Sequence, residues 1–458
     1  MAIVGQFVKD VLSQPAILVG LVALLGLIVQ RKPVGDVITG TVKTILGFVI
    51  LGAGANTLVG SLDKLSPLLE AGFGVRGVVP NNEAIVAIAQ NTLGRETALI
   101  MVFGLVANLL IARLTPLKYV FLTGHHTFFM AALLSAVLGT AGLSGAVLVL
   151  VGSFVLGVLM VLMPAMADTY MQRVTGGQPI ALGHFGTLGY WLAGFIGSKV
   201  GKAEDSIEQY RLPSTLSFFR DSLVATAVVM LVVFAVSVVA AGDKAVELAG
   251  DQNVWAFALT QSLGFTAGVA IILQGVRLII SEIVPAFQGI AARIVPEARP
   301  ALDCPVTFPH APTAVLVGFI SSFVGGLMSM LALAAAGLPV IVPGLVPHFF
   351  VGGTAGVFGN ATGGRRGCVV GAFVNGILIT VGAALLLPTL GALGFANTTF
   401  GDSDFQWVGI LIGAAGKVFG QSPMVLAAVV VVAFAFLLGL GAISTRRRRD
   451  MSATGVSA

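Results

Sequence analysis

The stretch AVLVLVGSFVLGVLMVLMPAM, residues 146–166, contains no charged side chain. A transmembrane helix needs about 20 consecutive apolar residues, so this stretch is long enough to cross a bilayer. The rest of the chain has the same character, because 57% of its 458 residues are hydrophobic and only 10% are charged. A soluble protein with this balance would have too few charged side chains to cover its surface. The sequence therefore predicts a polytopic membrane protein.

Similar apolar stretches recur along the chain and predict about 11 transmembrane helices in an all-α polytopic membrane protein. The clear candidates lie at 11–30, 37–60, 98–114, 119–138, 146–166, 222–241, 254–280, 312–336, 367–387 and 424–443. Proline and glycine interrupt other apolar stretches, some of which we expect to form re-entrant hairpins, at 180–197, 339–359 and 407–419. No convincing cleavage site follows the first run, so we expect a retained helix rather than a signal peptide.

Composition also excludes several classes of function. The net charge of +5 is small and the basic residues lie in loops and at the C-terminus, which argues against a nucleic-acid partner. The two cysteines, Cys304 and Cys368, have no paired spacing, so we expect neither a disulfide framework nor a thiolate metal site. The 59 glycines are typical of helices that pack closely or break inside a membrane. No Walker loop, nucleophile elbow or redox motif occurs, and no cofactor is predicted.

Basic residues next to the spans predict the orientation of the chain, because loops rich in Lys and Arg stay in the cytoplasm. An arginine run at 446–449 follows the last span, and Arg31 and Lys32 follow the first. Both groups are cytoplasmic if the N-terminus is outside and the number of spans is odd. We therefore expect residues 446–458 to form a basic cytoplasmic tail.

A weak internal repeat divides the chain. FLTGHHTFFM at 121–130 resembles GLVPHFFVGG at 344–353. We expect the first repeat at about 37–138, the second at about 272–387, and a linker with an interfacial helix between them at about 198–221. Repeats that each hold a broken polar segment are typical of transporters whose binding site lies between them, and we expect these two to have inverted topology.

A few ionisable residues stand within or beside these apolar stretches, where such a side chain is costly unless it is paired or faces a cavity. His125 and His184 each follow a glycine, where the backbone can come close to a ligand. Asp303 lies in the Pro-rich segment ALDCPVTFPHAP, and a carboxylate there can accept hydrogen bonds from two hydroxyl groups. These three are the predicted binding residues, whereas we interpret His310 and His348 as helix-packing residues.

The adjacent histidines, His125 and His126, are expected to have different roles. Neighbouring residues of a helix point about 100° apart, so both cannot face one small pocket squarely. We expect His125 to contact the ligand and His126 to pack against neighbouring helices. This geometry, together with the lack of a histidine pair at i, i+4, argues against a zinc site.

Several segments resemble the membrane component (IIC) of the L-ascorbate phosphotransferase system (PTS) permease. They follow the family's order over residues 11–445: RKPVGDVITGTVKTILGFVILGAG, FLTGHHTFF, ALGHFG, RLPSTLSFFRDSLVATAVVM, LQGVRLIISEIVPAFQGIAARIVPEARPALDCP and VPGLVPHFFVGGTAGVFGN. The resemblance implies a homodimer in the inner (plasma) membrane of a bacterial cell. It also implies an elevator-type transporter, in which a core domain with paired re-entrant hairpins moves against a scaffold.

The resemblance further implies how transport is driven. A separate cytoplasmic IIB protein carries a phosphocysteine, receives phosphate from IIA and phosphorylates the arriving sugar. The chain itself is then a transport subunit and not a catalyst. An ion-coupled secondary transporter of sugars or sugar acids, with Glu83 or Asp303 as the proton site, is the alternative. A membrane sensor that has lost transport is a third alternative.

The family's binding residues transfer to this chain in part. Its two substrate histidines and its aspartate fall on His125, His184 and Asp303. At the remaining positions, the family's Thr-Tyr pair falls on Asn82 and Glu83, its two glutamines fall on Phe129 and Phe185, and its backbone contacts fall near Gly54 and Ala55. A second carboxylate at Glu83 is unfavourable for an anion such as ascorbate. The sequence therefore favours the permease class more than it favours ascorbate itself.

The orientation can be tested by chemical labelling. We expect a cysteine introduced by Ser457→Cys to react with a membrane-impermeant thiol reagent only after the cells are opened, because the arginine run holds the tail in the cytoplasm. Labelling of intact cells would show that the tail is outside and that the predicted number of spans is wrong.

Overall fold

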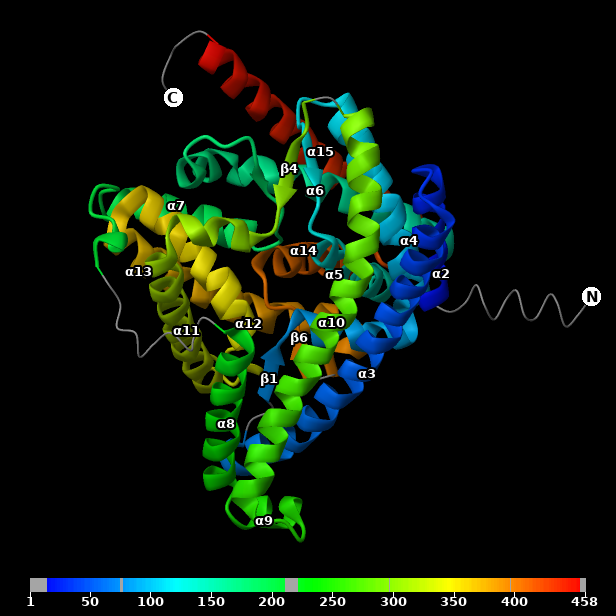
Figure 1. Ribbon diagram of the computed structural model, residues 1–458. Coiled ribbons are helices and arrows are strands. Elements are labelled where there is room, and N and C mark those ends of the chain that lie inside the picture. The colour runs from blue at the N-terminus through cyan, green and yellow to red at the C-terminus, as the bar shows by residue number, and fades with distance from the viewer. Residues whose placement is uncertain (1–14, 75–76, 211–220, 296, 396, 454–458) are drawn as a thin grey trace, which may run out of the picture.

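The computed structural model describes residues 15–74, 77–210, 221–295, 297–395 and 397–453, which are mostly helical (Figure 1). The α-helices are α2 (Pro15–Val29), α3 (Val34–Phe73), α4 (Asn82–Leu114), α5 (Gly124–Thr140), α6 (Gly145–Thr175), α7 (Thr187–Val200), α8 (Ser222–Ala241), α9 (Asp243–Ala249), α10 (Val254–Ile294), α11 (Pro312–Ala335), α12 (Leu345–Pro347), α13 (Gly353–Leu386), α14 (Ser403–Phe419) and α15 (Pro423–Ala453). Shorter 3₁₀ and π turns are η1 (Ile207–Gln209), η3 (Cys304–His310), η4 (His348–Gly352), η5 (Leu387–Thr389) and η6 (Gly391–Phe395).

Several of these helices are long and apolar enough to cross a membrane. In the described part of the chain there are 7, or up to 8 if the bent pair Thr226–Ala241 and Asp243–Ala249 forms one span. The chain is therefore a helical, polytopic membrane protein. The count is lower than the about 11 spans expected from hydropathy, and the predicted span at 11–30 begins outside the described residues.

One predicted span is wrong in detail. The apolar run at 119–138 is not one continuous helix, because it starts as strand β2 (Tyr119–Phe121) and becomes helical only at Gly124. Nearly all of α5 is buried. A short buried strand and a buried helix are equally apolar, so hydropathy cannot separate them. The interruptions expected at 180–197 and 339–359 are confirmed, since each of these stretches begins with a short strand. The interruption expected at 407–419 is wrong, because this stretch lies within the continuous helix α14.

The predicted linker and interfacial helix at 198–221 is only partly described. The end of α7 and the turn η1 occupy the described part, and 211–220 lies outside the described residues.

In the part of the chain that the structure describes, six short strands form two parallel sheets, each with three strands. The strands are β1 (Gly77–Pro80), β2 (Tyr119–Phe121), β3 (Ala181–Leu182), β4 (Arg299–Leu302), β5 (Val340–Ile341) and β6 (Thr398–Thr399). One sheet has the order β5-β1-β6 and the other β2-β4-β3. Each central strand thus lies between two strands from the other half of the sequence. This pairing supplies hydrogen bonds to backbone that is not helical, which burial in a membrane protein requires.

The two sheets face each other across the middle of the molecule. Figure 1 shows β1 and β4 running toward the centre from opposite ends. Gly77 and Val78 of β1 pair with β5, whereas Val79 and Pro80 pair with β6. In the other sheet, the residues from Arg299 to Ala301 of β4 pair with β2, and Ala301 and Leu302 pair with β3. The carboxyl ends of both central strands therefore point into the same central region.

The helices pack in two groups around these sheets. Helices α3 and α10 pack against each other and against α2 and α8. The other group includes α4 with α5 and α6, and α13 with α7, α11 and α14. Glycine permits the closest approaches: a Cβ atom at Gly376 of α13 would lie 2.0 Å from the carbonyl oxygen of Ser322 on α11. Small residues at helix contacts are typical of membrane proteins.

This close approach can be tested by substitution. Gly376→Ala should push α13 away from α11, because the new methyl group would meet backbone rather than a flexible side chain. Overpacking of this kind costs about 1–3 kcal/mol. We expect a lower apparent melting temperature in detergent. Gly439→Ala on α15 is the matched control, since nothing lies within 4 Å of that Cβ position, and equal melting temperatures for the two variants would contradict the packing described here.

Candidate functional site

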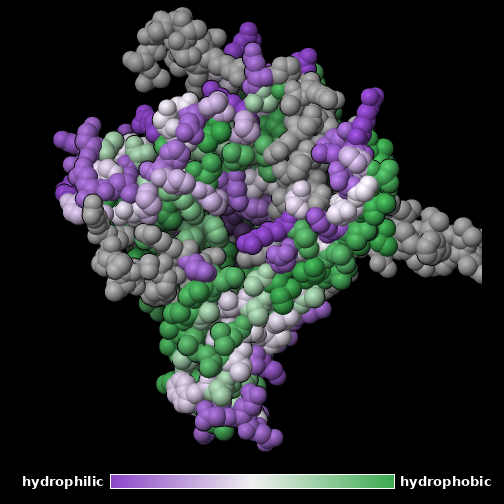
Figure 2. Space-filling view, viewed as in Figure 1, coloured by the Kyte–Doolittle hydropathy of each residue, from purple (hydrophilic) through white to green (hydrophobic). Residues whose placement is uncertain are grey.

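A polar cavity of about 330 Å³ lies where the carboxyl ends of the six strands meet. Each strand is followed closely by residues that line it: Asn82 and Glu83 after β1, His125 and His126 after β2, His184 after β3, Asp303 and Cys304 after β4, Val346 and Pro347 after β5, and Asp402 after β6. Figure 2 shows a hollow with hydrophilic surface at mid-height, above the hydrophobic surface of α8 and α10. Pairing between distant strands therefore builds one site from both halves of the sequence.

Asp303 joins the two predicted histidines. Its Oδ2 atom lies 3.3 Å from Nε2 of His125, and its Oδ1 atom lies 3.9 Å from Nε2 of His184. Oδ1 also accepts a hydrogen bond of 2.7 Å from the N–H of Cys304, which fixes the carboxylate at the start of η3. The structure thus brings together the three residues that the sequence singled out.

The hydrogen bonds of His184 define which ring nitrogen holds the proton. Nδ1 accepts from the backbone N–H of Gly186 at 3.0 Å and lies 2.8 Å from the hydroxyl of Tyr190. A backbone N–H can only donate, so Nδ1 has no proton and the neutral ring is protonated at Nε2. Nε2 lies within 4.0 Å of both Asp303 and Asp402, so it presents an N–H donor to the cavity.

His126 packs against a neighbouring helix as expected, since its ring stacks on Phe405 of α14 with centroids 5.7 Å apart, but it also lines the cavity. Its ring centroid is 3.7 Å from that of His184, and its Nδ1 atom lies 3.9 Å from Asp402. Nδ1 accepts a long hydrogen bond of 3.4 Å from the N–H of Phe185. The first turn of α5 projects into the cavity wall, so two adjacent residues can border the cavity although they point in different directions.

Two buried carboxyl groups complete the polar wall. Glu83 is 7% exposed, and its Oε2 atom has no hydrogen-bond partner among the described residues. Asp402 is 1% exposed and was missed in the sequence. Its neighbour Gly401 donates its N–H to Oδ1 of Asn82 at 2.8 Å, which ties the start of α4 to the loop before α14. The run GDSD at 401–404, between a polar strand end and an apolar helix, was the available signal.

Asp404 has a structural role beside the cavity. Its carboxylate accepts hydrogen bonds from the N–H groups of Thr187 and Leu188, at 2.8 and 3.1 Å, and so caps the start of α7. The indole of Trp407 donates to the same carboxylate at 3.0 Å. This cap links α14 to α7 and holds the segment that contains His184 in place.

Some side chains in the cavity lie close enough together to hold a metal ion. His126 with His184 and Asp402, and His184 with Asp303 and Cys304, each place three potential ligand atoms within 4.8 Å of one another, as do His125, His126 and Asp303. A metal on Nε2 of His184 would require the proton to move to Nδ1, where the N–H of Gly186 already donates. Both groups that contain His184 therefore suit a hydroxyl-bearing ligand better than a metal ion.

Not every predicted residue lies at the cavity. Phe129 lines it, but Phe185 is fully buried behind it and stacks on Phe121 with ring centroids 4.9 Å apart. Gly54 packs against Ile272 and Gly268 of α10, and neither Gly54 nor Ala55 of α3 is among the described residues that line the cavity. Of the two histidines interpreted as packing residues, His348 is buried and its Nδ1 atom lies 2.8 Å from the hydroxyl oxygen of Ser322. The interpretation of His310 is wrong, because its side chain is exposed.

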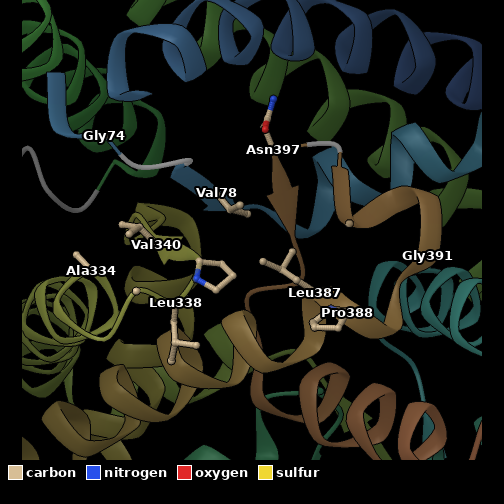
Figure 3. A pocket seen from close by; sticks show the side chains of 12 residues that line it. Gly74, Val78, Ala334, Leu338, Val340, Leu387, Pro388, Gly391 and Asn397 are labelled. Carbon is tan, nitrogen blue, oxygen red and sulfur yellow. The ribbon is translucent and has the colours of Figure 1, made fainter. Parts of the chain in front are cut away.

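A larger cavity of about 730 Å³ lies beside β1 and β5 (Figure 3). Apolar side chains such as those of Val78, Leu338 and Leu387 surround it, and Asn397 is the one polar side chain among its described lining residues. None of the described residues around it is titratable, and they form no cluster of hydrogen-bonding side chains. The smaller polar cavity is therefore the candidate binding site.

The fold and the cavity define a polytopic helical membrane protein with a polar site built from both halves of the chain. A family profile for the PTS system sugar-specific permease component, EIIC-GAT, matches residues 10–404, and the chain belongs to this family. The resemblance seen in the sequence is thereby confirmed.

A curated relative is similar over most of the chain. The ascorbate-specific PTS system EIIC component of Mycoplasma pneumoniae is 26% identical over 446 residues, which cover 85% of this chain. The chain spans 64% of the length of that relative.

The histidines of the cavity can be tested by substitution. His125→Ala should weaken binding of the transported sugar by about 1–3 kcal/mol, or roughly 5- to 150-fold, because it removes a polar group that faces the ligand. His126→Ala should weaken binding as well, since that ring lines the cavity and supports His184. His310→Ala is the matched control, because His310 is exposed and outside the cavity lining. Wild-type affinity in the His125→Ala protein, measured by calorimetry in detergent, would contradict this site.

Proposed function

We propose that the chain is the permease of a phosphoenolpyruvate-dependent sugar phosphotransferase system. It translocates L-ascorbate or a related small sugar or polyol, which a separate IIB protein phosphorylates on arrival. The observation that supports this most is the cavity in which Asp303 lies between His125 and His184. Such a site can bind several hydroxyl groups at once, because carboxylates accept hydrogen bonds and the Nε2–H of His184 donates.

The proposal includes two inverted repeats, at residues 34–200 and 254–419. They are longer than the repeats expected from the sequence, at about 37–138 and 272–387. Both contain the same order of elements: a long helix (α3 or α10), a central strand (β1 or β4), a helix, a flanking strand, further helices, and a second flanking strand before α7 or α14. The helical turns after the central strands begin alike, with Asn81 accepting from Ala84 and Asp303 accepting from Cys304. The opposed directions of β1 and β4 support inversion (Figure 1).

The two groups of helices support an elevator mechanism. Helices α3 and α10, with α2 and α8, would form the scaffold through which two protomers associate as a homodimer. The cavity is lined chiefly by residues outside this group, so it would move with the core. Arg277 of α10 is the one scaffold residue among the described lining residues, and core movement would change its distance from the site.

The distribution of basic residues supports a cytoplasmic C-terminus. Arg113, Lys118 and Arg299 lie together: the Nζ of Lys118 donates to the carbonyl oxygen of Arg113 at 2.9 Å, and the N–H of Arg299 donates to that of Lys118 at 2.8 Å. Figure 1 shows β4, which begins at Arg299, at the same end of the molecule as the end of α15. Clusters of Lys and Arg at one end of the spans favour the cytoplasmic side. The N-terminus would then be outside, in a bacterial inner membrane.

An ion-coupled secondary transporter is the second candidate. Glu83 favours it, because a buried carboxyl group with one oxygen unpaired among the described residues can hold and release a proton during transport. This mechanism would need no IIB protein and would accumulate the sugar unmodified.

The two candidates differ in the product of uptake. Right-side-out vesicles would be loaded with phosphoenolpyruvate, the general phosphotransferase proteins, IIA and IIB, and then given radiolabelled L-ascorbate and related sugars. We expect uptake to require phosphoenolpyruvate and to yield a phosphorylated product, because the chain is an EIIC component. Accumulation of free sugar that an ionophore abolishes, in vesicles without the phosphotransferase proteins, would favour the secondary transporter instead.

A further inference from the structure

Glu83 holds an unpaired carboxyl oxygen in the wall of the cavity. Its side chain is 7% exposed and lines the cavity, and its Oε2 atom is buried without a hydrogen-bond partner among the described residues. Buried polar atoms are nearly always hydrogen-bonded in native proteins, and exceptions occur at sites that receive a ligand. Glu83 follows Asn82, whose side chain is fixed by the N–H of Gly401, so the start of α4 is held firmly in the cavity wall.

The cavity lining offers little positive charge. Arg277 is the one Lys or Arg among the described lining residues, and it is exposed, whereas the carboxyl groups of Glu83 and Asp402 in the same wall are buried. A charged ligand that leaves water needs opposite charge or several hydrogen-bond donors close to it. The described lining would therefore compensate an anionic ligand poorly.

The polar groups instead match hydroxyl groups. A hydroxyl donates one hydrogen bond and accepts others, so it can lie between an acceptor such as Oε2 of Glu83 and a donor such as Nε2–H of His184. The rest of the lining is apolar and includes Phe129, Phe350 and Val346. Rings and aliphatic side chains of this kind pack against the C–H surface of a polyhydroxylated carbon chain.

We propose that Glu83 is a specificity residue that makes this cavity select an uncharged polyol or sugar over an anionic sugar acid. Oε2 of Glu83 forms a hydrogen bond with a hydroxyl group of the ligand, and the described lining supplies no buried Lys or Arg to pair with a negative charge. The inference rests on the proposed transport function, because it concerns the same site. The ligand class inferred here differs from that of the Mycoplasma pneumoniae relative, whose name gives it as ascorbate-specific.

Binding to the purified full chain in detergent tests this directly and needs neither IIA nor IIB. The probes are the uncharged pentitols and hexitols, the corresponding aldoses, L-ascorbate as the anion, and D-glucosamine as the cation. We expect the wild-type protein to bind at least one uncharged probe 10-fold or more tightly than L-ascorbate, a difference of about 1.4 kcal/mol. Glu83→Gln should weaken that binding roughly 5- to 150-fold and should improve the relative affinity for L-ascorbate.

A further variant serves as the control. Glu96→Gln lies on the same helix but outside the described cavity lining, so its affinities for all probes should equal those of the wild type. A loss of affinity in Glu96→Gln as large as that in Glu83→Gln would show that the effect of Glu83→Gln is not specific to the cavity and would overturn the inference.

Other results would overturn it as well. One is that L-ascorbate or D-glucosamine binds more tightly than every uncharged probe, and another is that no uncharged probe binds. The third is that the affinities are unchanged in Glu83→Gln while size-exclusion chromatography shows normal folding. Failure of the proposed transport function can be distinguished from failure of this inference. It would appear as uptake without phosphorylation, while the order of binding affinities among the probes would stay the same.

Discussion

The fold depends on hydrogen bonding of backbone that leaves the helical conformation in the interior of a membrane protein. Away from water, each unpaired N–H or C=O group is costly, so a helix can break only where another segment supplies partners. Here the partners are strands of two to four residues, which form two parallel sheets. These sheets allow α4, α5, α7 and α14 to begin in the middle of the molecule. Their starting turns, and the side chains on them, then surround one cavity.

The long helices were predictable, whereas the strands were not. The run at 146–166 lies within α6, and uninterrupted apolar residues of that length allow few other structures. Strands as short as β3 have no period that a sequence pattern could reveal. The run at 119–138 was therefore interpreted as one span, although it combines β2 with a buried helix. Tertiary pairing with β4 decides this structure, and the local sequence does not.

The site was predictable where ionisable residues interrupt apolar sequence. His125, His184 and Asp303 stood out for this reason, and the structure brings them together. Asp402 was missed because GDSD has the composition of an ordinary loop. Phe185 was expected to contact the ligand. Although it is next to His184 in the chain, its ring packs on Phe121. Which side of such a segment faces the cavity depends on the strand before it.

The exchange of strands between the two halves also determines the order in which the protein can be assembled. The partners of β1 are β5 and β6, at residues 340–341 and 398–399, so the first sheet cannot close until almost the whole chain has been synthesised. Until then, β1 has no strand to pair with in the membrane. Contacts between segments so distant in sequence form slowly. Once closed, the halves are interlocked. A cut in the connecting segment would leave two fragments that remain joined through both sheets.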